Sequence, residues 1–456
     1  MTPIESRPMI GTQRVRHRLL LTLALGETPE HLPAEAARRR GAATAASGID
    51  GGPIDRLLRH FGSAARVTRL HEARGLRYDT AEQLTGVARV LRVEVADDAH
   101  LSHLVDALRQ LPVVERASPD FLAAAPFEAV QDGVESETAW QSRRLIRLPQ
   151  ALGYEPGATS VAVGLADTGV SAAQVEIARQ LRSGFDTVDL TDAEVTGYTL
   201  VGDNRARDED PSDEVGHGTG CAGILVANGE ALPPGAAGAC ALVPVRVLGA
   251  ALAGQGRRVG IGAIANIDLG MKRLIDLGVK VINMSFGTPA AALGPDDPLP
   301  HAEIVRYALE RGCILVAASG NSGACERYYP AAHPGVIAVG AVDASAVPAR
   351  FSTRGDHVAL CAPGQAIRTC DRDGYTVASG TSFAAPFVAG VAALLAARAE
   401  RRAFPLQPEL ARQILMESAR PFAVAHQEGC GSGVLDALAA LECLDAQIDA
   451  RLEGDQ

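Results

Sequence analysis

Apolar runs that alternate with helical stretches are the feature that most constrains the fold of this chain. The first run, Val161–Ala166, is continuous and ends at Asp167, as expected for a strand buried on both faces. Residues 262–277 and 302–311 between later runs have the apolar spacing of helices. The later runs cover 241–248, 279–284, 314–318 and 336–342. This alternation predicts an α/β fold with a doubly wound parallel sheet, and places Asp167 at the carboxyl end of a strand, where functional residues gather.

The stretch Gly380–Gly390 crowds small residues around one serine, Ser382, and continues as an apolar run through Leu395. Its spacing predicts a buried helix, and Pro386 is tolerated only near the start of such a helix. A serine in the first turn lies where free backbone N–H groups and the helix dipole favour developing negative charge. Acyl transfer to a serine develops such a charge, so Ser382 is a candidate nucleophile. A Gly/Ser turn before a buried helix is the alternative interpretation.

Three separate stretches carry the groups that serine catalysis needs. A serine hydroxyl is a poor nucleophile unless a base removes its proton, and histidine, with a pKa near neutrality, suits that role. His217 lies in a glycine-rich stretch, 216–223, between Asp167 and Ser382. An aspartate is also needed to fix the imidazole tautomer and stabilise the imidazolium. The chain order Asp, His, Ser is one of the known orders of such a triad.

These stretches resemble the three active-site signatures of the subtilisin-like serine protease family (subtilases, peptidase family S8), and the match runs from about Trp140 to Asp436. The resemblance implies a subtilisin-like fold, with Asp167 as the orienting acid, His217 as general base and acid, and Ser382 as nucleophile. The stretch 317–323 resembles the oxyanion stretch of the family, so Asn321 is expected to donate its amide to the oxyanion. The alternative for Asn321 is a Gly-Asn turn residue.

The resemblance also implies a substrate site. Ser285-Phe286-Gly287 resembles the edge that pairs with substrate backbone as an added strand, and Gly254-Gln255-Gly256 is the candidate for the facing edge. Ser319 and Gly320, next to Asn321, complete the predicted substrate-binding residues. Tyr328 and Tyr329 either narrow the primary specificity pocket or pack in the core.

Some positions depart from common family patterns. Gly220 stands where many members have a second histidine, and Phe383 stands where many have methionine. The loop 228–238 does not match the tight calcium loop of the family, so no cofactor is required by the sequence and calcium lacks a clean motif. The acidic stretch 203–214 is interpreted as a solvated loop, with calcium binding or attraction of basic substrates as alternatives.

Residues 1–127 are predicted to form a small α+β domain close to a ferredoxin-like module. The expected elements are strands over 17–25, 87–95 and 113–117, helices over 54–61 and 101–108, and a mobile loop over 33–53. The passage 92–121 resembles the inhibitory pro-domains of subtilisin-like proteases, with an unrelated α+β sandwich as the alternative. Residues 128–139 are expected to be an acidic linker, and 140–456 the peptidase domain.

The net charge and the cysteine pattern limit which partners and which cellular compartment we expect. The formal net charge of -11 disfavours nucleic acid as a partner, and no apolar run has the length of a membrane span. Residues 14–25 form either a first strand, which we favour, or a weak signal peptide without a clear cleavage site. Cys221, Cys313 and Cys361 fall in apolar stretches and favour reduced core thiols. A cytoplasmic location is favoured, with secretion by a non-standard route as the alternative.

The sequence therefore predicts a serine endopeptidase, made as a self-processed zymogen that its own N-terminal domain inhibits and that acts on polypeptides. A binding protein on the same fold with an unused triad is the first rival. An unrelated serine lipase or esterase is the second, but no Gly-x-Ser-x-Gly elbow surrounds Ser382.

Overall fold

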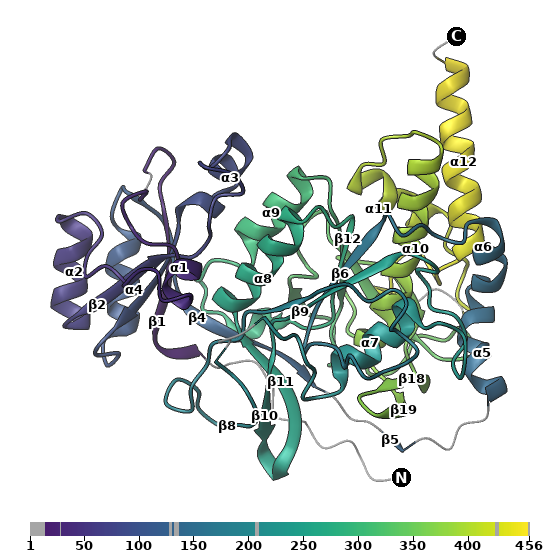
Figure 1. The fold of residues 1–456 in the computed structure, drawn as a ribbon, viewed down its shortest axis with the longest axis horizontal. Helices are drawn as coiled ribbons and strands as arrows, with labels where there is room; N and C mark the ends of the chain where they lie inside the picture. Colours follow the sequence, from purple (N-terminus) through teal and green to yellow (C-terminus); the bar gives the residue numbers. More distant parts are fainter. Residues whose placement is uncertain are drawn as a thin grey trace.

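A computed structural model describes residues 14–27, 29–126, 130–131, 136–205, 209–424 and 428–454. Its centre is a parallel sheet with strand order β17-β16-β14-β12-β6-β9-β7, seven-stranded within the described residues (Figure 1). In that order the strands are Val358–Pro363, Ile337–Val342, Ile314–Ala318, Val281–Met284, Ala162–Asp167, Ala241–Arg246 and Phe185–Asp186. The α/β fold with a parallel sheet that the sequence predicts is confirmed.

Helices cover both faces of this sheet because successive residues of each strand are apolar on both sides. The helices of this part are α5 (Ser136–Leu145), α6 (Leu148–Tyr154), α7 (His217–Val226), α8 (Ile264–Asp276), α9 (Ala302–Glu310), α10 (Thr381–Arg401), α11 (Pro408–Glu417) and α12 (Ala437–Gly454). One core cluster joins Val281 and Val316 of the sheet to α7 and α10. The second joins Ile282 and Leu315, their chain neighbours, to α8 and α9.

The order of the strands reverses at β6. The chain passes from β6 to β9 on one side and then returns to β12 on the other side of β6. In sheets of this kind the crevice outside the carboxyl end of such a switch strand is where ligands bind. Asp167 is the last residue of β6, so the topology places it at that crevice.

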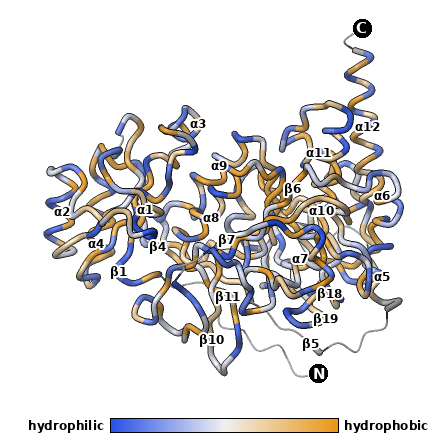
Figure 2. Tube along the Cα trace, viewed as in Figure 1, coloured by the Kyte–Doolittle hydropathy of each residue, from blue (hydrophilic) through white to orange (hydrophobic). Residues whose placement is uncertain are grey.

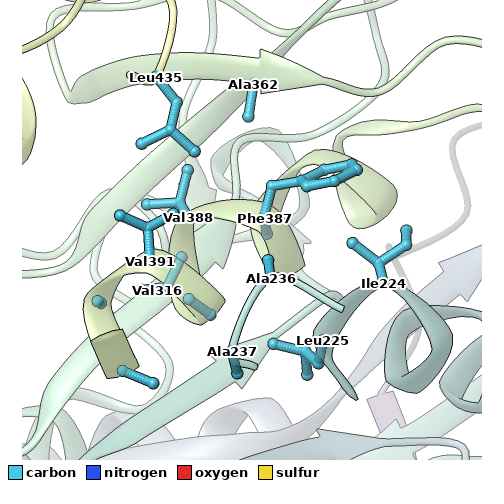
Figure 3. Packing of buried hydrophobic residues seen from close by; sticks show 14 of the residues in the cluster. Ile224, Leu225, Ala236, Ala237, Val316, Ala362, Phe387, Val388, Val391 and Leu435 are labelled. Atoms are coloured by element: carbon cyan, nitrogen blue, oxygen red, sulfur yellow. The ribbon is translucent and has the colours of Figure 1, made fainter. Parts of the chain in front are cut away.

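Helix α10 is the central helix of residues 140–456, the predicted peptidase domain, which we call the peptidase part. Its residues Phe387, Val388 and Val391 pack against α7 and the sheet, as the labelled side chains show (Figure 3). Of the described helices, α10 alone is long and apolar enough to cross a membrane, but 89% of that window is buried inside the protein. The apolar character of α10 is therefore that of a core helix, and the chain is most hydrophobic around β6 and α10 (Figure 2).

The N-terminal part holds a second, antiparallel sheet with strand order β2-β3-β1-β4. Its strands are β1 (Arg14–Leu23), β2 (Ala65–Arg69), β3 (Val90–Val95) and β4 (Val114–Pro126), and its helices are α1 (Glu35–Arg39), α2 (Pro53–Gly62), α3 (Thr80–Thr85) and α4 (Leu101–Arg109). Helices α2 and α4 bury Leu58 and Leu104 against Leu19 and Leu21 of β1. Residues 14–25, the ambiguous stretch of the sequence, thus contribute the strand β1.

Several elements of this part differ from the sequence-based expectation. Residues 87–89, predicted as the start of a strand, form a 3-10 turn, and β3 begins at Val90. The predicted loop 33–53 contains helix α1, because Glu35 and its neighbouring arginines are drawn into a buried ion network. Strand β4 does not stop at Ala117 but runs on to Pro126. Of the predicted linker, 130–131 form strand β5 (Val130–Gln131) and 136–139 begin α5, while residues 128–129 and 132–135 lie outside the described residues.

The extension of β4 joins the two parts of the molecule. Residues 122–126 pair antiparallel with β11 (Arg257–Ala263), which forms a hairpin with β10 (Gly249–Ala253). One sheet therefore runs from the N-terminal strands through β4 into the peptidase part (Figure 1). The remaining short strands are β8 (Thr199–Leu200), β13 (Thr288–Pro289), β15 (Tyr328–Tyr329), β18 (Ile367–Asp371) and β19 (Gly374–Ala378).

Buried ion pairs fasten the same junction. Arg92, 2% exposed, lies 2.7 Å from Glu35 of its own part and 3.3 Å from Asp189 of the peptidase part. Asp120 of β4 lies 3.5 Å from Arg18 and accepts a hydrogen bond of 3.1 Å from the N–H of Ala265, in the first turn of α8. An aspartate there satisfies a free N–H and the positive end of the helix dipole.

Candidate active site

Asp167 and His217, two of the residues predicted for catalysis, come from separate elements and meet at the carboxyl end of β6. Asp167 ends β6 and His217 begins α7, and Nδ1 of His217 lies 2.7 Å from Oδ1 of Asp167. Both side chains are fully buried. The same carboxylate oxygen accepts the N–H of Thr168 at 2.7 Å, which fixes its orientation. An imidazole held in this way presents Nε2 as the proton acceptor.

Ser382 lies in the first turn of α10, as the sequence predicts. Its Oγ donates a hydrogen bond of 3.1 Å to the carbonyl of Ser285, and the Ser285 hydroxyl donates one of 2.9 Å to the carbonyl of Ser382. Cys221, one turn after His217 on α7, donates to that same carbonyl at 3.3 Å. These contacts hold the nucleophile, the histidine helix and the predicted substrate edge together.

Asn321 lies in the turn after β14, facing the start of α10. Its side-chain oxygen accepts the N–H of Thr381 at 2.8 Å and the Thr381 hydroxyl at 3.0 Å. Because that oxygen is taken, the amide nitrogen is the group that remains for a ligand. The free N–H of Ser382 and this amide therefore belong to one helix start, a geometry suited to an oxyanion.

The predicted substrate edge is already paired in this structure. Ala124 of β4 forms an antiparallel bridge with Gly287, with N···O distances of 3.5 and 3.4 Å. On its other side Ala124 pairs with Ile261 of β11. Residues 122–126 thus fill the slot between β11 and Ser285–Gly287 as the middle strand. The edge over 285–287 pairs through its backbone, because the Phe286 side chain is only 3% exposed and packs in the core.

Gly254 and Gly256, predicted for the facing edge, are not among the residues that pair with β4. Both lie in the turn Gly254–Gly256 at the tip of the β10–β11 hairpin, beyond the paired residues. The strand that faces Ser285–Gly287 across residues 122–126 is Val259–Ala263 of β11. The glycine-rich pattern alone did not distinguish the tip of the β10–β11 hairpin from the strand β11 that follows it.

Ser319 and Gly320 lie beside Asn321 but have different roles in the fold. The Ser319 hydroxyl is fully buried and donates to the carbonyl of Thr353 at 3.1 Å, so that side chain does not face a substrate. Gly320 has a φ of +111°, which favours glycine, and its N–H donates to the Thr381 hydroxyl at 3.2 Å. Gly320 therefore ties the oxyanion turn to the start of α10.

Asp213 is a buried carboxylate beside Asp167 and His217, and the sequence analysis gave it no separate role. Its carboxylate accepts the hydroxyls of Thr168 and Thr219 and the N–H groups of Val215, Gly216 and Thr219, all at 2.6–2.9 Å. Burial raises the pKa of Asp213 above its ordinary value. It therefore fixes the residues next to Asp167 and His217. Its place four residues before His217, at a helix start, was the signal that could have identified it.

The rest of the acidic stretch is exposed at Asp203, Glu209 and Asp210, in keeping with a solvated loop, and some of its carboxylates pair with arginines. Glu214 lies 2.6 Å from Arg246, and Glu209 pairs with Arg273. Asp208 lies outside the described residues. The carboxylates described here already have protein partners, which does not fit a calcium site.

The loop 228–238 does not fit calcium either. The buried carboxylate of Glu176 accepts backbone N–H groups from Gly229, Glu230, Ala231 and Leu232. The loop thus directs donors inward, whereas calcium requires a shell of oxygen ligands. Within the described residues, one cluster of three metal-ligand side chains occurs, namely Asp167, His217 and Cys221, and two of these are residues predicted for catalysis. Burial and the neighbouring carboxylate of Asp167 raise the pKa of the Cys221 thiol well above its ordinary value.

Comparisons with known proteins agree with this geometry. Residues 158–433 match the subtilase family. The chain is 31% identical to the thermophilic serine proteinase of Bacillus sp. (strain AK1) over 308 residues, or 65% of this chain and 66% of that protein. It is 34% identical to thermitase of Thermoactinomyces vulgaris over 256 residues, or 56% of this chain and 80% of thermitase.

A solved structure titled as proteases from Pseudoalteromonas arctica PAMC 21717 shares the fold. The TM-score is 0.56 at 24% identity, and the likeness covers 68% of this chain and 97% of that one. The chain therefore belongs to the subtilase family of subtilisin-like serine endopeptidases.

Proposed function

We propose that this chain hydrolyses peptide bonds in extended polypeptides through an acyl-enzyme on Ser382. The observation that carries the proposal is the hydrogen bond of 2.7 Å between His217 and Asp167, next to a serine at the start of α10. In this mechanism His217 takes the proton of Ser382 as its Oγ attacks the carbonyl, and Asp167 stabilises the imidazolium. The amide of Asn321 and the N–H of Ser382 stabilise the oxyanion.

The collapse of the tetrahedral intermediate then releases the amine, to which His217 gives its proton, and leaves the ester on Ser382. A water molecule, activated by His217, attacks the ester in the second half of the reaction. The polypeptide is held in the slot between β11 and Ser285–Gly287, where main-chain hydrogen bonds bind any extended sequence. Selectivity must therefore come from the places where side chains enter pockets.

We further propose that the chain is a zymogen and that its own residues 122–126 are its first inhibitor. Ala124 occupies the substrate slot as an added strand, so another polypeptide cannot enter while it remains. The ion pairs of Arg92 and Arg18 with the peptidase part support a stable docked state. Processing between about 122 and 139 would free the slot once the N-terminal part is released.

A fluorophosphonate probe with an affinity handle tests the proposed chemistry. We expect covalent labelling of Ser382, identified by mass spectrometry, in the protein that has lost residues 1–127 by its own cleavage. Replacement of His217 by Ala, in a chain freed of its N-terminal part by an added protease, should abolish the labelling because the base is gone. Labelling of another serine, or none in folded and processed protein, would reject the assignment and favour a binding protein on this fold.

A further inference from the structure

The ring of Tyr328 occupies the space next to the proposed scissile bond. A Cβ atom built on Gly320 would lie 2.6 Å from Cδ2 of Tyr328, and one built on Gly287 would lie 3.3 Å from its Cδ1. The ring is thus in contact with two glycines, one from the oxyanion turn and one from the substrate edge. We propose that Tyr328 fills the pocket for the residue before the cleaved bond (the P1 residue) and restricts it to Gly, Ala or Ser. This inference rests on the proposed function, whose substrate class it narrows.

The position of the pocket follows from the contacts around Ser382. A polypeptide paired with Ser285–Gly287 must bring its reactive carbonyl to Oγ of Ser382, which lies 3.1 Å from the Ser285 carbonyl. The residue that carries this carbonyl then lies between the substrate edge and the turn of Asn321. Gly287 and Gly320 have no side chains to fill that gap, so the P1 side chain would enter between them.

Tyr328 is fixed in that gap by its backbone and its surroundings. It pairs with Pro289 and its neighbour Tyr329 pairs with Thr288 in the two-stranded sheet of β13 and β15. Strand β13 directly follows the substrate edge, so the ring is held relative to Gly287. Burial and the neighbouring Glu326 raise the pKa of Tyr328 above its ordinary value, so its hydroxyl stays neutral. The uncharged ring of Tyr328 is therefore held in place and limits the space in this pocket.

A pocket narrowed by a phenol ring excludes larger P1 side chains by steric overlap with that ring. One excess methylene in a tight apolar pocket costs about 10-fold or more in kcat/KM. A P1 Phe or Leu exceeds Ala by several carbons, so its exclusion should be larger.

The test compares two fluorogenic peptides that are identical except for Ala or Phe before the scissile bond. The full-length chain is used after its own processing. We expect the wild-type protein to prefer the Ala peptide by at least about 100-fold in kcat/KM. In Tyr328→Ala the pocket opens, and the ratio should shift toward Phe by at least about 10-fold, whereas Tyr328→Phe keeps the ring and should keep the wild-type ratio.

The Ala peptide also serves as the control for folding and for the chemistry. If Tyr328→Ala fails to hydrolyse it, the smaller change Tyr328→Val provides the same comparison. Equal hydrolysis of both peptides by the wild-type protein would overturn the restriction while leaving the proposed function intact. No hydrolysis of either peptide, or of an unfolded protein, by processed wild-type chain would overturn the proposed function itself.

Discussion

At the scale of single residues, two departures from the family pattern have one steric cause. A Cβ atom on Gly220 would lie 3.1 Å from Cε1 of Phe383, which is tighter than ordinary van der Waals contact. The Phe383 ring in turn packs on the His217 ring, with 5.4 Å between centroids. Glycine on the histidine helix thus makes room for a ring that limits movement of the catalytic imidazole. The sequence shows both residues but not that they touch.

Replacement of Gly220 by His should therefore be harmful while Phe383 is present. Overpacking of this kind costs about 1–3 kcal/mol, and here it would also push the imidazole of His217. The second change Phe383→Met removes the ring and should restore much of the peptidase activity. A double-mutant cycle on kcat/KM and on the melting temperature measures the coupling, and strictly additive effects would show that the two sites are independent.

Asn321 allows the oxyanion interaction to be separated from helix capping. Asn321→Ala should lower kcat by roughly 10²–10³ with little change in KM, the magnitude known for loss of the oxyanion donor in subtilisin itself. In the wild-type protein the N–H of Thr381 donates to Oδ1 of Asn321 at 2.8 Å. The matched variant Asn321→Asp keeps this acceptor but has no amide donor. It should lose kcat and keep its thermal stability. A rise in KM with kcat unchanged would make Asn321 a substrate-binding residue instead.

At the scale of elements, the parallel sheet was predictable and the end of β4 was not. Strand β6 and its neighbours are continuous apolar runs, so local sequence sufficed to predict them. The stretch 122–126 is an alanine run with no period of its own, and it is a strand because β11 and Gly287 pair with it. The residues proposed for catalysis fall in distinctive motifs, whereas the position of the facing edge depends on where the β10–β11 hairpin turns. Asp213 was hidden in an acidic run whose partners only the fold brings together.

The register of this strand makes a prediction about processing. Continuing the pairing of Ala124 with Gly287 puts residue 126 opposite Ser285, and a proline there has no N–H to donate to the Ser285 carbonyl. Pro126→Ala supplies that donor and should speed self-processing severalfold. The measure is the rate at which the shortened chain appears on refolding, with Pro119→Ala, in the same strand, as the control. Equal rates in all three proteins would show that the slot does not use this register.

At the scale of the whole molecule, charge pairs far apart in the sequence join the two parts. Arg18 and Arg92 meet Glu194 and Asp189 across the junction, so no local pattern could have predicted them. Burial alone raises the pKa of Glu35, but the hydrogen bond from Arg38 and the charge of Arg92 outweigh it and hold that pKa well below its ordinary value. At Asp189, burial alone also raises the pKa, but the charges of Arg92 and Arg39 outweigh it and hold that pKa below its ordinary value.

A carboxylate with a depressed pKa in the folded state stabilises the protein only while it is ionised. Its contribution is fully present above the ordinary carboxyl pKa of about 4 and is lost as the pH falls through the lower folded value. In a Ser382→Ala background, the contribution of these pairs to the free energy of unfolding should therefore stay constant from pH 7 to about 4.5. It should decrease as the pH is lowered further. Thermal unfolding across this range measures it.

Asp189→Asn is the control for this dependence. It should be less stable by on the order of 3 kcal/mol at pH 7, because Arg92 loses a buried partner, and its acid-induced loss should be smaller. An identical fall in both proteins would show that the junction does not titrate through this carboxylate.

The most direct test of the whole account is the intact mass of the refolded full-length chain, with and without Ser382. The wild-type chain should cut itself between about 122 and 139 and gain peptidase activity, whereas Ser382→Ala should stay full-length. Its kcat on peptides should be lower by on the order of 10⁶, the scale known for loss of this residue in subtilisin. A Ser382→Ala chain that is still shortened when purified alone, or that keeps more than about a tenth of the wild-type activity, would contradict the account.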